Sequence, residues 1–458
     1  MIDPHIFRAY DIRGKADSQI TEEACEQIGH AFGTVLRERY KKDHPTVAVG
    51  RDARTHGPKL EQALRKGLMK AGCHLIFIGQ TPSPVNYFTI CNLELDGGVQ
   101  VTASHNPADD NGLKLQLREA EAYAGEDLQD LRKRIEQKKF LNGTGKEETI
   151  DAVAAYEQHL LQLFPSAGNG LKIVVDGGNG VAGKMYSEVL RKSGAEIIEL
   201  FTEPDGTFPN HPADPSKWET LKDLQSAVLS HKANAGFAYD GDGDRLGIVD
   251  ETGKIRSADD ILLMLAEDHL ERNPGAAIVF TVSNSSALET EITKWGGDPL
   301  MCKVGHSFVE HAMRERGALL GGEQSGHFFC FENYYGFDDA LVASLHMLSI
   351  MRKRKESLSS ILQKYPKVYQ APERRPYCPD DQKTGIIERI TKHFEKSYPV
   401  VTLDGARVDF GDGAWAGIRQ SNTSPCLSIC LEARSEAKLK EVEIRVLDHL
   451  KTYPAITL

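Results

Sequence analysis

The sequence predicts an α/β protein of three related α/β domains with mixed sheets, followed by a C-terminal α+β domain. Three observations support this fold class. Predicted strands and helices alternate through the first 330 residues, and the same order of elements occurs there three times. From residue 366 onward the pattern changes to short strands enclosed by two helices. Such alternation is typical of βαβ units on parallel or mixed sheets, and 458 residues suffice for three or four domains.

Each of the three copies consists of three predicted strands with a helix after the first and the second. In residues 1–150 these elements are Thr46–Gly50, Pro58–Ala71, His74–Ile78, Val85–Asn92 and Gly98–Thr102. In residues 151–255 they are Leu171–Val175, a helix through Leu190, Glu196–Phe201, Trp218–His231 and Gly236–Tyr239. In residues 256–365 they are Ala277–Val282, Ala287–Trp295, Leu300–Val304, Phe308–Arg316 and Ala318–Leu320.

A glycine follows the first helix of each copy, at Gly72, Gly194 and Gly296, as expected where a helix ends in a left-handed residue. The separations between these glycines are those of whole domains, too long for a solenoid repeat. Each third strand runs into an unusual polar motif, at 102–107, 240–245 and 321–327. In sheets of this kind ligands bind beyond the carboxyl ends of the strands. The three motifs are therefore expected at equivalent places in three domains.

The last segment, residues 366–458, follows a linker and is expected to form the small α+β domain. Its predicted elements are Gln382–Lys396, Val400–Leu403, Arg407–Phe410, Leu427–Glu432 and Ser435–Thr452.

Composition excludes several classes of protein. There are 55 Lys and Arg against 66 Asp and Glu, so the net charge is −11 and a general nucleic-acid surface is not expected. No apolar run reaches the length of a membrane span, and the N-terminus lacks the pattern of a secretory signal. The eight cysteines form no C-x-x-C pair, which indicates reduced thiols and a cytoplasmic location.

Asp240, Asp242 and Asp244 alternate with glycines after the third strand of the second copy. Three carboxylates this close repel one another unless a cation neutralises them, and oxygen ligands suit Mg²⁺ or Ca²⁺. A calcium loop of the EF-hand type, completed by Glu251, is one alternative, but Arg245 stands where that loop needs glycine, and strands flank the segment. A solvated acidic turn is the other alternative. The pattern favours Mg²⁺.

Ser104 has the same position in the first copy that the aspartates have in the second. A local turn or cap is the commonest use of a loop serine, and no G-x-S-x-G elbow indicates a hydrolase nucleophile. A serine that faces a metal site can instead carry a phosphoryl group. The repeat favours this last interpretation.

Two further loops suit a phosphorylated sugar. Glu323, Ser325 and His327 alternate, so in an extended loop they would point to one side; a helix-entry turn with a surface histidine is the alternative. The run Arg419–Thr423 offers a guanidinium, hydroxyls and amides to a phosphate, although a plain polar hairpin is also possible. Arg8 to Gly14 offers two more guanidinium groups, and Lys303 and His306 end a strand of the third copy.

Four motifs together resemble one family. T-A-S-H-N-P at 102–107, D-G-D-G-D-R at 240–245, G-E-Q-S-G-H at 322–327 and R-Q-S-N-T-S-P at 419–425 occur in this order. The chain resembles the α-D-phosphohexomutases from end to end, and the opening F-R-A-Y-D-I-R-G and the S-N-T triplet are similar to the phosphomannomutase/phosphoglucomutase branch. Two positions depart from the pattern. Ala103 stands where many members have Gly, and Gln324 where the mannose branch often has Met and the glucosamine branch often has Gln.

The resemblance implies four domains arranged around a central active-site cleft. It implies that Ser104 is a phosphoserine and that Ser104, Asp240, Asp242 and Asp244 hold Mg²⁺. Glu323 and Ser325 would contact sugar hydroxyls, and the non-transferring phosphate would be held by Arg419, Ser421, Asn422 and Thr423. The cleft would be completed by Tyr10, Arg13, Lys114, Arg245, His306 and His327, with Lys114 and His327 as acid/base candidates. We expect Lys303 to bind substrate as well.

The expected reaction is reversible transfer of phosphate between the 1- and 6-positions of mannose and glucose phosphates. Phosphorylated Ser104 would donate to the free hydroxyl, and the hexose 1,6-bisphosphate would turn end for end before its other phosphate returns to Ser104. The C-terminal domain would loosen for this turn and then close to exclude water. The alternatives are a phosphoglucosamine mutase, a sugar-phosphate phosphatase and a non-catalytic sugar-phosphate sensor. We expect small hexose phosphates as the only partners of a monomer or homodimer.

Overall fold

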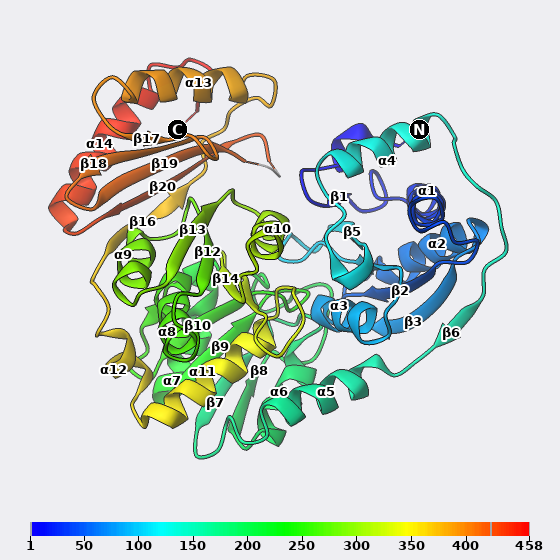
Figure 1. The fold of residues 1–458 in the computed structure, drawn as a ribbon, viewed down its shortest axis with the longest axis horizontal. Coiled ribbons are helices and arrows are strands. Elements are labelled where there is room, and N and C mark those ends of the chain that lie inside the picture. Colours follow the sequence, from blue (N-terminus) through cyan, green and yellow to red (C-terminus); the bar gives the residue numbers. More distant parts are fainter. Residues whose placement is uncertain (1, 422–423, 458) are drawn as a thin grey trace.

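The computed structural model describes residues 2–421 and 424–457. The chain forms four sheets in succession, each packed against helices (Figure 1). In the view of Figure 1 the first sheet lies to the right, the second and third lie in the middle, and the fourth lies at the upper left. The fold is therefore α/β with four sheet-containing domains, as the sequence predicts.

The first sheet has the strand order β1-β5-β4-β2-β3-β6. Its strands are β1 (Ile12–Lys15), β2 (Thr46–Arg51), β3 (His74–Gln80), β4 (Gly97–Val101), β5 (Asp110–Gln116) and β6 (Glu147–Thr149). Its helices are η1 (Pro4–Ile6), α1 (Glu22–Tyr40), α2 (Gly57–Lys70), α3 (Ser83–Asn92), η2 (Arg118–Ala120) and α4 (Glu126–Glu136).

The second sheet has the order β11-β10-β9-β7-β8. Its strands are β7 (Lys172–Asp176), β8 (Glu196–Leu200), β9 (Ala235–Tyr239), β10 (Leu246–Asp250) and β11 (Ile255–Arg256). Its helices are α5 (Ala152–Leu163), α6 (Gly183–Lys192), η3 (Trp218–Leu221) and α7 (Lys222–His231).

The third sheet has the order β13-β12-β14-β15. Its strands are β12 (Ala277–Thr281), β13 (Asp298–Cys302), β14 (Leu320–Gly322) and β15 (Phe328–Cys330). Its helices are α8 (Ala258–Arg272), α9 (Ser286–Lys294), α10 (His306–Arg316), α11 (Ala340–Arg354) and α12 (Leu358–Leu362).

The fourth sheet, of order β16-β20-β19-β18-β17, is antiparallel throughout. Its strands are β16 (Tyr369–Arg374), β17 (Val400–Val401), β18 (Ala406–Gly411), β19 (Ala414–Gln420) and β20 (Leu427–Ala433), and its helices are α13 (Lys383–Phe394) and α14 (Glu436–Leu450). Side chains from these elements form a hydrophobic core of their own.

The first three sheets share one topology. In each sheet one central strand, β2, β7 or β12, pairs in parallel with the next two strands of the chain. A further strand then runs antiparallel to the second of these two. The shared units are β3-β2-β4-β5, β8-β7-β9-β10 and β13-β12-β14-β15. The predicted repeat is confirmed. Gly72, Gly194 and Gly296, which follow the first helix of each unit, all have positive φ.

Several elements differ from the sequence prediction. The predicted helix Trp218–His231 is a short η3 followed by α7, and the strand predicted at Leu300–Val304 lies two residues earlier, in β13. The helices α1, α4, α5, α8, α11 and α12 were not predicted. In two of these helices, α8 and α11, ten of the fifteen residues are buried, so the exposed polar face that gives a surface helix its period is narrow. No described helix is long and apolar enough to cross a membrane.

Candidate active site

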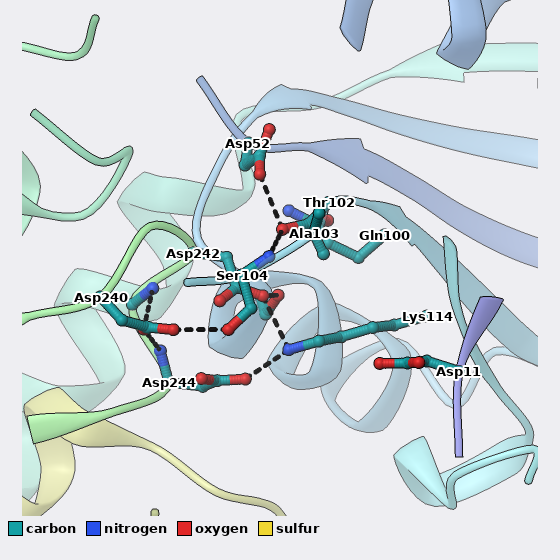
Figure 2. A network of polar contacts seen from close by, with 12 residues as sticks. Asp11, Asp52, Gln100, Thr102, Ala103, Ser104, Lys114, Asp240, Asp242 and Asp244 are labelled. Atoms are coloured by element: carbon teal, nitrogen blue, oxygen red, sulfur yellow. Dashed lines mark hydrogen bonds and ion pairs between the residues drawn. The ribbon is translucent and has the colours of Figure 1, made fainter. Parts of the chain in front are cut away.

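The three polar motifs occupy the same position in the three related sheets. The loop with Ser104 joins β4 to β5, the loop with Asp240 to Asp244 joins β9 to β10, and the loop of Glu323 to His327 joins β14 to β15. Each loop follows the carboxyl end of a parallel strand, where ligands bind in such sheets. Figure 2 shows the first two loops facing each other, with Lys114 reaching the aspartates from β5. The predicted equivalence of the motifs is confirmed.

Ser104 is buried, and its φ of 50° is left-handed, which is uncommon for a residue with a side chain. Its Oγ donates a hydrogen bond to Asp240 Oδ2 at 2.6 Å and lies 3.2 Å from His105 Nδ1. Burial, and then the charges of Arg245 and Arg13, lower the pKa of His105 well below its ordinary value, so this imidazole is neutral. The serine hydroxyl thus faces the aspartate cluster directly.

Asp240, Asp242 and Asp244 are fully buried, and one oxygen of each lies within 4.8 Å of the others. Asp240 Oδ1 accepts the backbone amides of Gly243, Asp244 and Arg245, which fixes the loop. Burial, and then the charges of Asp244 and Asp242, raise the pKa of Asp240 well above its ordinary value. The loop therefore concentrates negative charge that needs a cation.

These residues fit the metal that the family resemblance implies. The donor set is all oxygen, which suits a hard divalent ion. Oδ1 of Asp242 and Oδ1 of Asp244 are buried and have no hydrogen-bond partner in the described part of the chain, so both remain available as ligands. Glu251, the twelfth residue of the rival calcium loop, instead accepts the amide and hydroxyl of Ser359. The EF-hand alternative is therefore excluded by position as well as by sequence.

Lys114 on β5 supplies positive charge to the cluster. Its Nζ donates to Asp242 Oδ2 at 2.7 Å and also to Asp244, and its side chain is 3% exposed (Figure 2). Burial disfavours its charge, but Asp242 and then Asp244 outweigh burial and hold the pKa of Lys114 well above its ordinary value. Burial likewise disfavours charge on these two aspartates, yet Lys114 keeps both pKa values below the ordinary one.

Arg13 and Arg245 extend the site. Arg13 on β1 is buried, lies 2.6 Å from Asp11, and donates to Ala103 O and Asn106 Oδ1 of the serine loop. Arg245 Nε donates to His327 Nε2 at 2.9 Å and thereby joins the second loop to the third.

His327 is neutral and held on both sides. Burial lowers its pKa to about 4. While Arg245 binds Nε2, Asp338 Oδ2 lies 2.6 Å from Nδ1. His306 stacks on His327 at a ring distance of 5.7 Å, and Tyr10 meets His306 edge-on at 5.3 Å. Tyr10 from the first domain and the two histidines from the third thus form one aromatic wall.

The loop of Glu323, Ser325 and His327 is a tight turn and not extended, so the idea that alternation aims all three to one side is wrong. Gly326, with a φ of 93°, donates its amide to Glu323 O and closes the turn. The carboxylate and the hydroxyl nevertheless stay close, with Ser325 Oγ 3.5 Å from Glu323 Oε2. Glu323 Oε1 also accepts the Gly305 amide at 2.7 Å, directly before His306.

The fourth predicted loop belongs to the C-terminal sheet. Arg419 is the second-last residue of β19, and its buried Nε has no hydrogen-bond partner among the described residues. Ser421 is buried and accepts Arg375 Nη2 at 3.1 Å, while Lys383 donates to the carbonyls of Ser421 and Ser424. Asn422 and Thr423 lie outside the described residues. Lys303 is exposed beside the ring of Phe308, apart from the buried cluster.

Sequence reasoning missed five residues that support these loops. They are Asp52, Arg54, Asp338, Arg375 and Lys383. For Asp52 and Arg54 a signal was present, because they follow β2, which lies beside β4 in the sheet. The other three have no local pattern that marks them.

Comparison with known proteins agrees with this geometry. Family models described as phosphoglucomutase/phosphomannomutase match four successive parts of the chain: alpha/beta/alpha domain I at 4–142, domain II at 150–253, domain III at 257–369 and the C-terminal domain at 376–449. The chain belongs to the α-D-phosphohexomutase family. It is therefore an isomerase with phosphohexomutase activity.

Individual relatives cover nearly the whole chain. A phosphomannomutase/phosphoglucomutase of Pseudomonas aeruginosa is 40% identical over 447 residues, which is 97% of this chain and 95% of the relative. A phosphoglucomutase of Neisseria gonorrhoeae is 37% identical and covers 98% and 97%. The crystal structure of a phosphoglucomutase/phosphomannomutase family protein from Burkholderia thailandensis superposes with a TM-score of 0.92 at 37% identity, and covers all of both chains.

Proposed function

We propose that this phosphohexomutase moves phosphate reversibly between the 1- and 6-positions of mannose and glucose phosphates, with Ser104 as the phosphoryl carrier and a hexose 1,6-bisphosphate as the intermediate. The single observation that carries the proposal is the hydrogen bond of 2.6 Å from Ser104 Oγ to Asp240 Oδ2. It joins a loop serine to a buried carboxylate cluster 136 residues away in the sequence. A serine in this position can pass a phosphoryl group to a sugar hydroxyl and take one back.

The proposed metal is Mg²⁺, held by Asp240, Asp242, Asp244 and Ser104. When bound, it would neutralise the charge on the transferring phosphate. The chain's own residues position the reactants. Lys114, Arg13 and Arg245 surround the serine with positive charge, and Lys114 and His327 are the groups for proton movement at the sugar hydroxyl. Neutral His327 can accept a proton at Nε2 once Arg245 turns to a phosphate.

Two more sets of residues are proposed to hold the substrate. Glu323 and Ser325, 3.5 Å apart, suit adjacent sugar hydroxyls. Arg419 and Ser421, with Asn422 and Thr423, are proposed to bind the phosphate that does not react. The buried Nε of Arg419, which has no hydrogen-bond partner within residues 2–421 and 424–457, supports this role. Tyr10, Lys303 and His306 are proposed as further substrate contacts. Such a second phosphate site is what a bisphosphate that turns within the site requires.

The names of the relatives support mannose and glucose as alternative sugars, since one is called a phosphomannomutase/phosphoglucomutase and another a phosphoglucomutase. Gln324 keeps a phosphoglucosamine mutase as the second candidate. A phosphatase or a non-catalytic sensor is less well supported, because Ser104, Lys114 and all three aspartates are present together.

The boundaries 1–150, 151–255, 256–365 and 366–458 remain our proposal for the four domains. The eight cysteines are all unpaired, which supports a reducing, cytoplasmic location. A monomer or homodimer remains the expected state.

The intact mass of the purified enzyme tests the carrier. After incubation with glucose 1,6-bisphosphate, the wild-type chain should gain one phosphoryl group, and Ser104→Ala should gain none. Because Ser104 lies in a loop and fills little core volume, Ser104→Ala should keep the wild-type melting temperature while turnover falls at least about 10³-fold. Near-normal turnover in the folded variant would exclude the phosphoserine.

A further inference from the structure

Arg54 is one of the largest fully buried side chains of the protein, with 1% of its surface exposed. All five of its N–H groups are used. Nε donates to Asp52 Oδ2 at 3.1 Å, Nη1 donates to the carbonyls of Pro107 and Asp110 at 2.5 and 2.9 Å, and Nη2 donates to the carbonyls of Ser104 and Asn106 at 2.8 and 2.6 Å. One guanidinium thus binds four backbone carbonyls of the loop that carries Ser104.

This loop needs an external support because its local conformation is unfavourable. Ser104 is left-handed, with a φ of 50°, a conformation that disfavours any residue with a Cβ. The carbonyl of Ser104 points inward to Arg54, and a buried carbonyl without a donor is costly. Without the guanidinium, four carbonyls would have to turn to other donors, and the direction of Ser104 Oγ would change with them.

Asp52 supports the same loop through a second route. Its Oδ2 also accepts the hydroxyl of Thr102 at 2.7 Å, and Thr102 Oγ1 in turn accepts the amide of Ser104 at 2.9 Å (Figure 2). Asp52 Oδ1 accepts the amide of Arg54. The amide and the carbonyl of Ser104 are therefore both fixed from one carboxylate, through Thr102 on one side and Arg54 on the other.

The neighbouring domain shields the Arg54 side chain from water. The ring of Phe208, in the loop after β8, lies 5.2 Å from the Arg54 guanidinium. Gly206 packs so closely that a Cβ there would lie 2.4 Å from Ala53 O and 2.6 Å from Arg54 Cα. Exclusion of water strengthens the bonds of Arg54 to the loop.

We propose that Arg54 is a positioning residue for the reaction: it touches no reacting atom, but it fixes Ser104 in the left-handed conformation that aims Oγ at Asp240. This inference rests on the proposed role of Ser104 as phosphoryl carrier. In this proposal Arg54, Asp52 and Thr102 fix the position of Ser104 Oγ relative to the substrate. Other residues bind the sugar.

Arg54→Lys tests the proposal, because lysine keeps the charge but offers one nitrogen in place of the fork that reaches four carbonyls. The matched control is Arg37→Lys. Arg37 lies in the same domain and also donates to two carbonyls, those of Ala71 and Asn142, and to the carboxylate of Asp43. It is remote from the serine loop, so its replacement should cost stability alone.

The readout is the rate constant at which glucose 1,6-bisphosphate phosphorylates the enzyme, followed by rapid quench and intact mass. A misplacement of the nucleophile on the order of 1 Å lowers rates by about 100-fold. Arg54→Lys should therefore lose about 100-fold in this rate constant and in kcat, with KM for glucose 1-phosphate changed less than about threefold. Arg37→Lys should keep the wild-type rate constant at a similar loss of melting temperature.

Thr102→Val and Thr102→Ser provide a second test that does not depend on whether Arg54→Lys folds. Valine removes the hydroxyl that binds the Ser104 amide, whereas serine retains it. The valine variant should lose at least about tenfold in the phosphorylation rate, and the serine variant should remain close to wild type.

The proposal is overturned if Arg54→Lys loses no more rate than Arg37→Lys, or if Thr102→Ser loses as much as Thr102→Val. Failure of the underlying function looks different. In that case the wild-type enzyme itself gains no phosphoryl group from the bisphosphate, or gains it at a residue other than Ser104.

Discussion

Removing single charges from the aspartate cluster should affect stability unequally when no divalent cation is present. Asp242 and Asp240 differ in their partners. Asp242 Oδ2 accepts Ser83 Oγ at 2.5 Å and Lys114 Nζ at 2.7 Å, whereas its Oδ1 is unpartnered. No described lysine or arginine nitrogen lies within ion-pair distance of Asp240, which accepts three backbone amides and the Ser104 hydroxyl.

The expected magnitudes follow from these partners. In Asp242→Asn the amide oxygen can keep both bonds of Oδ2, but the loss of charge weakens the Lys114 bond by about 1–2 kcal/mol, and the new NH₂ is a buried donor without a partner, at a further cost of about 1–3 kcal/mol. In Asp240→Asn the oxygen keeps the three amides, the NH₂ can donate to Ser104 Oγ, and repulsion from two neighbouring carboxylates disappears. Stability should then stay level or rise by about 1 kcal/mol.

Urea denaturation followed by far-ultraviolet circular dichroism, in excess chelator, measures the difference. Asp242→Asn should be at least about 2 kcal/mol less stable than Asp240→Asn. The exposed Asp130→Asn, whose partner is the neighbouring Lys133, is the control and should lie within about 0.5 kcal/mol of wild type. Added Mg²⁺ should stabilise wild type more than either cluster variant. Equal destabilisation by Asp240→Asn and Asp242→Asn would refute the reasoning that Asp240 carries uncompensated charge.

Three further predictions concern other parts of the molecule. Arg419→Ala should raise KM for glucose 1-phosphate about ten- to a hundred-fold, the value of a charge-assisted phosphate contact, and lower kcat less; steady-state kinetics with an unchanged KM would move the phosphate site elsewhere. Burial raises the pKa of Asp259 to about 6, so the folded protein holds a proton that the unfolded chain releases, and stability declines as the pH rises from about 4 to 6. The free energy of unfolding in urea should fall by about 3 kcal/mol less between pH 4 and pH 7 in Asp259→Asn than in wild type. An equal fall in the two proteins would contradict this prediction. Mannose 1-phosphate and glucose 1-phosphate should have similar kcat/KM, with glucosamine 1-phosphate poorer, because the hydroxyls that we propose Glu323 and Ser325 contact are shared by mannose and glucose. A preference of about a thousandfold for any one sugar would show that the site reads the second carbon.

Much of the fold and the site could be predicted from the sequence because the signals are local. Apolar runs that alternate with helical patterns, and the glycines that end the first helices, define the βαβ repeat before any contact is known. The ends of β4, β9 and β14 then place Ser104, the aspartates and Glu323 at one equivalent edge, since parallel strands with the same connections present their carboxyl ends alike. Helix α1 was also open to prediction, because Thr21 caps it and Glu22 and Glu23 follow.

What the tertiary structure alone decided is how these edges meet. No local pattern says that Lys114 pairs with Asp242 and Asp244 while no described lysine or arginine pairs with Asp240, or that Asp338 lies beside His327. The Lys114 contacts join the first sheet to the second, whereas the contact of Asp338 with His327 lies within the third domain. The turn at Glu323 to His327 is also a result of the tertiary structure. The alternation of polar residues alone predicts an extended loop there. Charges and pKa values depend on burial and on partners brought together from distant parts of the chain. The sequence by itself therefore determined the repeat of strands and helices and the polar motifs that follow the third strands. Only the packing of the sheets decided which residues of those motifs share a charge, a proton or a fixed conformation.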